Sequence, residues 1–318
     1  KATFRFSPRL HFTTDIRLHT NTAVMKHGKL SYLIKPMIII AGAMLVTPAV
    51  AQDDDRDLRP ARSAFESIWH IDNQTVLVPI KGTFELDFSH RFGTLDNGYD
   101  DFFGIAAPSN IRIGLEYVPL DNLMIGFGIT KERKIWDFWA KYALTTQKRS
   151  GGAPVSVSYL VNMGWDTRDA DLFEETTDRF AFFHQVMIAR NFSRKVAVQL
   201  APSLSYFNDP VIEIDGEGVE TGRMENMHFA LAALGKWKIT PGTAVLLNVD
   251  VPLTSHEIND PEPNISFGLE FVTSSHAFQV FIGNYKSLVP QYNQVLNQNS
   301  FGDGNILIGF NMTRLWNF

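Results

Sequence analysis

The chain has 318 residues, of which 45% are hydrophobic, a formal net charge of −5, and no cysteine. This acidic balance excludes the basic footprint of a nucleic-acid-binding protein, and the missing cysteines exclude disulfides. No segment after residue 51 is long and apolar enough for a membrane helix, so any membrane-spanning segments must be strands.

The N-terminal region has the pattern of an export signal. Three lysines precede an apolar run over 37–46, and small residues follow up to Ala51. This pattern predicts a signal peptide over 25–51, cut after Ala51, and the alternative is a membrane anchor. Residues 1–24 are interpreted as an over-extended leader. Residues 1–51 hold seven of the 29 basic and one of the 34 acidic residues, so the remainder carries 22 bases and 33 acids.

Residues 52–79 form a separate segment. They begin with three aspartates and interspersed arginines and continue with Phe65, Ile68, Trp69 and Ile71. We interpret them as a periplasmic N-terminal segment whose ordered part covers the barrel mouth or acts as a partial plug. A mobile linker is the alternative.

Twelve strand-like segments follow, each close to the nine to eleven residues that a tilted strand needs to cross a bilayer. Most alternate apolar and polar residues with a period of two. The sixth and eleventh are ambiguous, because two apolar residues are adjacent in each. The segments are 82–91, 110–118, 122–130, 135–145, 154–165, 180–191, 196–207, 227–239, 243–252, 264–272, 276–285 and 305–317.

The predicted connections alternate between short and long, which is typical of periplasmic turns and outer loops. The short ones are 119–121, 146–153, 192–195, 240–242 and 273–275, and the long ones are 92–109, 166–179, 208–226, 253–263 and 286–304. Only 131–134 breaks the rule, as a tight hairpin on the long-loop side. Acidic residues gather in the long connections, where we expect solvated charge.

The last segment ends in aromatic residues on its apolar face. Phe310, Trp316 and Phe318 share that face and are interpreted as an assembly signal for barrel insertion. Other aromatics take the outward parity near the two ends of the strands, as membrane-interface belts do. The sequence therefore predicts an all-β protein, an antiparallel transmembrane β-barrel of about twelve strands over 80–318, in the bacterial outer membrane.

Several motifs resemble an uncharacterised Bacteroidota family of outer-membrane β-barrel proteins, a domain of unknown function. The similarity is densest from about 65 to 165, and His90-Arg-Phe-Gly93 is its most specific part. It implies the fold and the location but brings no catalytic residues. The motifs are Phe65-Glu-Ser, Ile71-Asp-Asn-Gln74, Phe88-Ser-His-Arg-Phe-Gly93, Ile111-Arg-Ile-Gly-Leu-Glu-Tyr117, Leu123-Met-Ile-Gly-Phe-Gly128 and Lys141-Tyr-Ala-Leu-Thr-Thr-Gln147.

Nine charged residues take the inward parity and are the candidates for lining the lumen. They are Glu85, Asp87, Arg91, Arg112, Glu116, Asp137, Lys141, Asp250 and Glu270. Six acids against three bases favour cations over anions. The hypothesis is a passive channel for small polar solutes or a structural envelope protein, in which the same residues form a network of ion pairs.

Two other classes remain as alternatives. An outer-membrane lipid or peptide hydrolase needs a nucleophile beside a base, but none of His90, His184 and His228 accompanies a recognisable nucleophile motif. A soluble secreted β-sandwich would instead bury the apolar parity in a core. We expect no catalytic residues, cofactor, metal or nucleic acid. The expected partners are outer-membrane lipid and lipopolysaccharide, the barrel-assembly machinery and a small polar solute.

Overall fold

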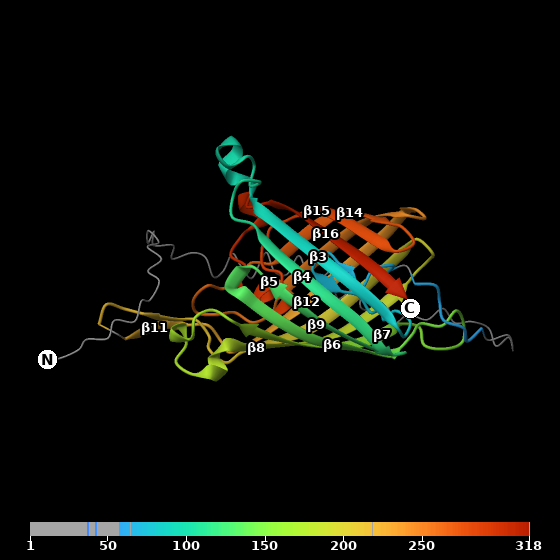
Figure 1. Ribbon diagram of the computed structural model, residues 1–318, viewed down its shortest axis with the longest axis horizontal. Helices are drawn as coiled ribbons and strands as arrows, with labels where there is room; N and C mark the ends of the chain where they lie inside the picture. The colour runs from blue at the N-terminus through green and yellow to red at the C-terminus, as the bar shows by residue number, and fades with distance from the viewer. Residues whose placement is uncertain (1–36, 38–41, 43–56, 64, 218, 318) are drawn as a thin grey trace.

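Twelve antiparallel strands close into a barrel in the computed structural model, which describes residues 37, 42, 57–63, 65–217 and 219–317. Each strand pairs with its neighbours in chain order, and the last pairs with the first (Figure 1). The strands are β3 (Thr83–Thr94), β4 (Asn110–Leu120), β5 (Leu123–Thr130), β6 (Ile135–Thr145), β7 (Ser156–Asp166), β8 (Phe180–Asn191), β9 (Val196–Phe207), β12 (Met227–Thr240), β13 (Thr243–Pro252), β14 (Asn264–Val272), β15 (His276–Gly283) and β16 (Leu307–Asn317).

The predicted fold class is confirmed, and most strand boundaries fall within two residues of the prediction. The main difference is β3, which continues three residues further, to Thr94, because β16 remains beside it and pairs Leu307 with Thr94. Strand β15 ends two residues early, at Gly283. There the side chain of Asn284 accepts a hydrogen bond from the Ile265 amide (2.8 Å), which takes over from the ladder.

The two faces of the barrel wall differ in polarity. In β4, Arg112 and Glu116 are buried on the inner face, while Ile113 and Leu115 are 51% and 46% exposed on the outer face. An outer face this apolar is stable against lipid, since lipid requires no polar partner. The two ambiguous strands resolve in the same way: Phe183 and Phe281 are buried, whereas Val280 is 52% exposed.

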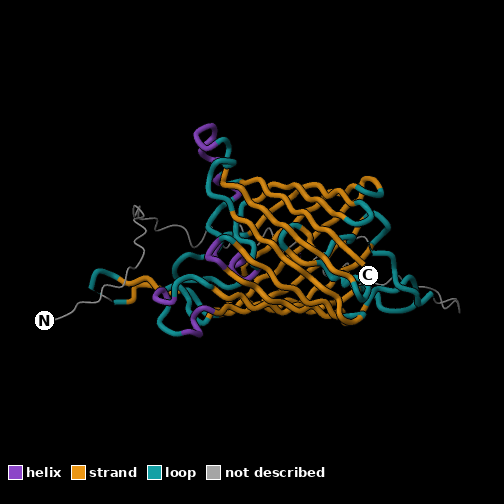
Figure 2. Tube along the Cα trace, viewed as in Figure 1, coloured by secondary structure: helices purple, strands orange, loops and turns teal. Residues whose placement is uncertain are grey.

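Connections at the two ends of the barrel differ in length, as predicted. Short turns join the strands at one end, and the other carries the long loops with their small elements (Figure 2). These are 3₁₀ turns η1 (Leu95–Asp101), η2 (Glu132–Lys134), η3 (Ala170–Leu172), η4 (Thr176–Arg179) and η5 (Phe301–Asp303), the hairpin β10 (Ile212–Ile214) and β11 (Glu220–Arg223), and helix α2 (Pro290–Leu296). No helix in the described part of the chain is both long and apolar enough to cross a membrane.

A second, smaller hairpin lies inside the barrel. Its strands β1 (Trp69–His70) and β2 (Asn73–Gln74) pair with each other and not with the wall. The leader over 1–24 and Phe318 lie outside the described residues, as does the signal peptide over 25–51 except for residues 37 and 42.

Candidate functional site in the barrel lumen

The structure places all nine candidate residues on the inner face of the wall, each with 2% or less of its surface exposed. They come from five strands, β3, β4, β6, β13 and β14. The alternation of the strands brings them inward, because successive side chains point to opposite faces. The lumen therefore carries these charges beside a cluster of buried apolar side chains that includes Met124, Trp139 and Phe183.

Arg112 makes the strongest ion-pair cluster in the lumen. Its guanidinium bonds Asp87 on β3 (Nη1–Oδ1, 2.5 Å) and Asp137 on β6 (Nε–Oδ1, 2.9 Å; Nη2–Oδ2, 2.8 Å). The guanidinium lies over Gly128, where a Cβ atom would collide with it. It also lies 5.2 Å from the ring of Trp69 in the inner hairpin. This one residue links three wall strands and the hairpin.

Glu85 and Glu116 form the opposite arrangement. They face each other directly across β3 and β4. None of their four carboxylate oxygens accepts a hydrogen bond from a donor within the described residues. Lys141 is near enough to attract both carboxylates, but its Nζ donates to the carbonyl oxygen of Thr75 (3.1 Å). Buried carboxylates of this kind need water or a cation as a partner.

The inner hairpin is held by side chains from around the wall. Gln279 accepts from the Ile71 amide (3.0 Å) and donates to the carbonyl of Trp69 (2.8 Å). Gln199 does the same on the other side, accepting from the Val76 amide (2.9 Å) and donating to the carbonyl of Gln74 (2.8 Å). These amide side chains replace the ladder partners that the hairpin lacks.

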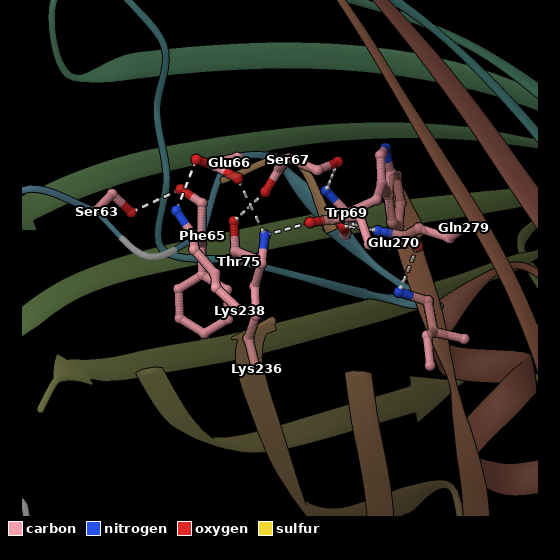
Figure 3. A network of polar contacts seen from close by, with 12 residues as sticks. Ser63, Phe65, Glu66, Ser67, Trp69, Thr75, Lys236, Lys238, Glu270 and Gln279 are labelled. Atoms are coloured by element: carbon pink, nitrogen blue, oxygen red, sulfur yellow. Dashed lines mark hydrogen bonds and ion pairs between the residues drawn. The ribbon is translucent and has the colours of Figure 1, made fainter. Parts of the chain in front are cut away.

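A chain of charges anchors the hairpin where it enters the barrel from the short-turn end (Figure 3). Lys238 binds Glu66 (Nζ–Oε1, 2.6 Å), and Lys236 lies 3.8 Å from the same carboxylate. Lys236 also pairs with Glu270, which accepts from Gln279 (3.0 Å). These contacts thus connect Glu66, before the hairpin, to Gln279, which bonds the backbone of the hairpin.

Helix α2 closes the lumen from the long-loop end. Its Gln291 donates to Asn162 on β7 (3.1 Å), and Ser203 on β9 donates to Gln294 (2.7 Å). Five of its seven residues are buried. The loop over 286–304 therefore folds into the barrel, whereas the loop over 92–109 stays outside it.

The two inserted segments meet at Asp72, in the turn of the hairpin. One carboxylate oxygen accepts from the Tyr285 hydroxyl (2.5 Å) and the other accepts from the Asn293 amide of α2. Asn73, the next residue, donates to Asn248 (3.0 Å) and Asp250 (2.9 Å) on β13. We call Asp72, Tyr285 and Asn293 the latch.

Two cavities remain at the long-loop end. One, of about 150 Å³, lies between α2 and the β7–β8 and β9–β10 loops and is lined by Arg168, Phe173 and Tyr292 among others. The second, of about 170 Å³, is lined by polar residues that include Glu132, Lys286 and Asn293. Both end at α2, so the inserted segments separate these cavities from the rest of the lumen.

Several residues at this site were not predicted from the sequence. Lys236 was missed although its position opposite the outward Trp237 indicated the inner face. The hairpin and latch residues had no period-two signal, since they do not belong to wall strands. The sequence indicated this region in two ways, through the apolar residues Phe65 to Ile71 and through the motif Ile71-Asp-Asn-Gln74, but neither predicted a hairpin.

The histidines are dispersed. His184 lies on the outer face and bonds the Tyr159 hydroxyl (2.9 Å), while buried His228 bonds His256 of the 253–263 loop (Nδ1–Nε2, 3.0 Å). Among the residues that the structure describes, no group of three or more His, Asp or Glu side chains is arranged to hold a metal ion.

Comparison with known proteins gives the family. Residues 65–316 match the family described as membrane bound beta barrel domain (DUF5777). An outer membrane channel from Pseudomonas putida F1 is similar in fold at 13% identity, with a TM-score of 0.48 over 76% of this chain and 97% of that chain. The NanC porin is similar at 6% identity, with a TM-score of 0.47 over 74% and 99%. A search of curated proteins found no similar sequence.

Proposed function

Because this chain belongs to the family of membrane bound beta barrel domains (DUF5777), we propose that it is an outer-membrane channel for small polar solutes, closed in this conformation by its two inserted segments. The solute path follows the inner face of β3 and β4. Cations are favoured, since the lumen carries more acids than bases.

The observation that carries the proposal is the facing pair of Glu85 and Glu116. Their carboxylates are buried and receive no hydrogen bond from a donor in the described part of the chain. On the neighbouring stretch of β3, Nε and Nη2 of Arg91 are also buried and donate to no acceptor among the described residues. A sealed structural network would pair these groups, whereas a hydrated path supplies water to them.

Opening requires the inserted segments to move. The hairpin occupies the centre of the barrel, and its tip reaches the latch beneath α2. Ile68, Trp69 and Ile71 pack against apolar side chains of the wall, and the hydrogen bonds between hairpin and wall involve side chains rather than a strand ladder. Such hydrogen bonds exchange with water at a modest net cost of about 1 kcal/mol each, so displacement of the hairpin is compatible with an intact wall.

A structural envelope protein is the second candidate. The density of bonds between hairpin and wall favours it, because a permanent plug would leave no path. Catalysis is not part of the proposal: the Tyr159–His184 pair lies on the outer face, and the His228–His256 pair has no serine, threonine or lysine bonded to it in the described residues.

Conductance of the purified full chain in planar bilayers tests the proposal. We expect brief cation-selective openings of the native protein and longer openings of Asp72→Ala, which removes the latch carboxylate. Asp100→Ala, in the exposed 95–107 region, is the matched control and should behave as the native protein does. A silent native protein together with a silent Asp72→Ala variant would favour the structural role.

Selectivity provides the second measurement. Glu116→Lys places a cation opposite Glu85 and should reduce or reverse the cation preference of the open state. Glu116→Gln removes one charge without adding another and should have a smaller effect. A selectivity that neither substitution changes would contradict a path along β3 and β4.

A further inference from the structure

The loop between β3 and β4 exposes four large apolar side chains on a short segment. Tyr99 is 77% exposed, Phe102 55%, Phe103 52% and Ile105 53%. We call residues 95–107 the aromatic arm. Soluble surfaces rarely carry so many large apolar groups together unless they meet a partner or a membrane.

The arm has a defined internal structure. The Asp101 carboxylate accepts from the Asn97 side chain (3.0 Å) and from the Gly104 amide (2.8 Å), and the Phe103 amide donates to the carbonyl of Gly98 (2.6 Å). Its legs approach so closely that a Cβ atom at Gly104 would collide with the carbonyl of Gly93. The backbone of the arm is therefore ordered by its own hydrogen bonds and close contacts, and the exposed rings have fixed positions on it.

Backbone strain accompanies this display. Phe102 and Phe103 both have φ of 57°, in the left-handed region that disfavours bulky residues. Strain at consecutive aromatic residues persists only where the surrounding contacts impose it. Here both side chains remain more than half exposed, and the Phe102 ring contacts the ring of Tyr99 (5.5 Å between centroids).

The position of the arm indicates what it meets. Figure 1 shows η1 projecting sideways from the barrel, at the level where the strands end on the long-loop side. The hairpin β10–β11, in contrast, extends outward along the barrel axis in the same view. A lateral arm at the strand ends lies over the ring of lipid that surrounds the wall.

The arm also continues an aromatic strip on the outer face of the wall. His90 stacks on Phe310 (5.2 Å) and lies 4.3 Å from Phe92, and Phe88 stacks on Phe310 (5.8 Å). The strip follows the lipid face of β3 up to Phe92, close in sequence to Leu95, which is the first residue of the arm. The lipid contact of the wall and the exposed rings are therefore contiguous.

We propose that the aromatic arm inserts into the headgroup–acyl boundary of the lipid around the barrel, as an anchor on the long-loop side. Aromatic residues with amphipathic rings favour this boundary. Of the three acidic residues in the arm, Asp101 is bonded within the arm and Asp96 accepts from Asn305 (2.9 Å). Asp100 is exposed, and its carboxylate has to stay at the level of the headgroups while the rings insert. A second copy of the chain is the competing occupant, which the test separates from lipid.

The absence of native cysteine allows a direct measurement. Phe102→Cys and Tyr99→Cys are each labelled with a nitroxide in the full chain and reconstituted into phosphatidylethanolamine–phosphatidylglycerol vesicles. Val219→Cys, 58% exposed beside β11, is the matched control. Power-saturation spectroscopy then compares accessibility to oxygen, which concentrates in lipid, with accessibility to a water-soluble nickel chelate.

We expect oxygen to exceed the nickel chelate severalfold at both arm positions and the order to reverse at Val219. Nickel access as high in the arm as at Val219 would overturn the proposal. So would spin–spin broadening at Phe102 that grows with the protein-to-lipid ratio, since it would identify a second copy as the occupant. Heat-modifiable gel migration of each labelled variant confirms a folded barrel, and the result is independent of whether the lumen conducts.

Discussion

At the residue scale, the charged residues of the inner face are of two kinds: those with a charged partner, and those, such as Glu85 and Glu116, that accept from no donor among the described residues. Arg112 illustrates the first case, because three elements depend on its guanidinium. A buried ion pair contributes little net stability when it is complete, yet removal of one partner leaves the others buried and charged. The effect of a substitution therefore depends on what it leaves behind.

Arg112→Met should strongly destabilise the barrel, because Asp87 and Asp137 would remain buried beside each other without a cation. We expect a loss of about 3–5 kcal/mol in the free energy of unfolding, measured by urea unfolding in detergent. Arg314→Met, the same change on the exposed outer face, is the control and should alter stability by less than about 1 kcal/mol. Equal effects of the two substitutions would contradict the role assigned to Arg112.

His256 gives stability a dependence on pH. Its Nδ1 accepts from the Glu225 amide (2.9 Å), so its Nε2 carries the proton that faces His228. Burial lowers the pKa of His256, and Asp260 offsets part of that shift. The unfolded chain thus binds a proton at higher pH than the folded chain does, and folding stability falls as pH decreases below about 6.5.

We expect the unfolding midpoint in urea to be constant from pH 8 to 7 and to decrease as pH falls from 6.5 to 5. His256→Gln keeps a hydrogen-bonding side chain but cannot titrate, so it should make this decrease smaller. The assignment would be disproved if the unfolding midpoints of the native protein and of His256→Gln changed by the same amount between pH 7 and pH 5.

At the element scale, the inner hairpin is the unit that decides whether the lumen is open. Its turn holds Ile71 at φ of 62°, unusual for a β-branched residue. The Ile71 side chain is fully buried against Leu246, Phe281 and Tyr285. Packing against the wall therefore maintains a strained turn, and release from the wall would relieve that strain.

A covalent bridge between hairpin and wall should hold the channel closed. The Asn73 and Asn248 side chains are 3.0 Å apart (Nδ2–Oδ1), within reach of a short bis-methanethiosulfonate after Asn73→Cys and Asn248→Cys. We expect the reagent to abolish conductance and a reductant to restore it. Each single-cysteine variant is a control and should be insensitive to bridging. Openings that persist in the bridged protein would show that the path does not require movement of the hairpin.

At the scale of the whole molecule, closure of the sheet is what permits an apolar exterior and a charged interior in one chain. Closure pairs β16 with β3, so no strand edge faces lipid. The wall can therefore remain intact while internal segments move. The wall and the inserted segments can move separately because they are held by different contacts. Backbone ladders join the wall strands to one another, whereas side chains join the inserted segments to the wall.

Assembly of the barrel should depend on the C-terminal strand. Phe318→Asp is expected to lower the inserted amount while synthesis continues, because it places a charge at the end of the apolar face of 305–318. Membrane fractionation and heat-modifiable migration measure this. Asn317→Asp, the neighbouring position of opposite parity, is the control, and equal insertion of the two variants would reject an assembly role for Phe318.

The period-two pattern of the sequence determined the barrel, its twelve strands, and the inward position of Glu85, Arg112 and the other charged candidates. That was possible because lipid outside and polar contacts inside impose opposite demands on alternate residues, and each strand carries this record independently of its neighbours. Even the ambiguous eleventh strand followed the register of the strands on either side of it.

Only the tertiary structure decided how the lumen is filled, because the sequence left residues 52–79 as a cover, a partial plug or a mobile linker. The hairpin contacts residues more than 200 positions away, such as Gln279, Tyr285 and Asn293. The polar side chains at those positions form hydrogen bonds with the hairpin only after the barrel has closed, and no local sequence pattern encodes these pairs. The loops over 92–109 and 286–304 illustrate the same limit. Both are long, yet one projects sideways from the barrel and the other enters it, because burial of an amide-rich helix requires partners that only the closed wall supplies.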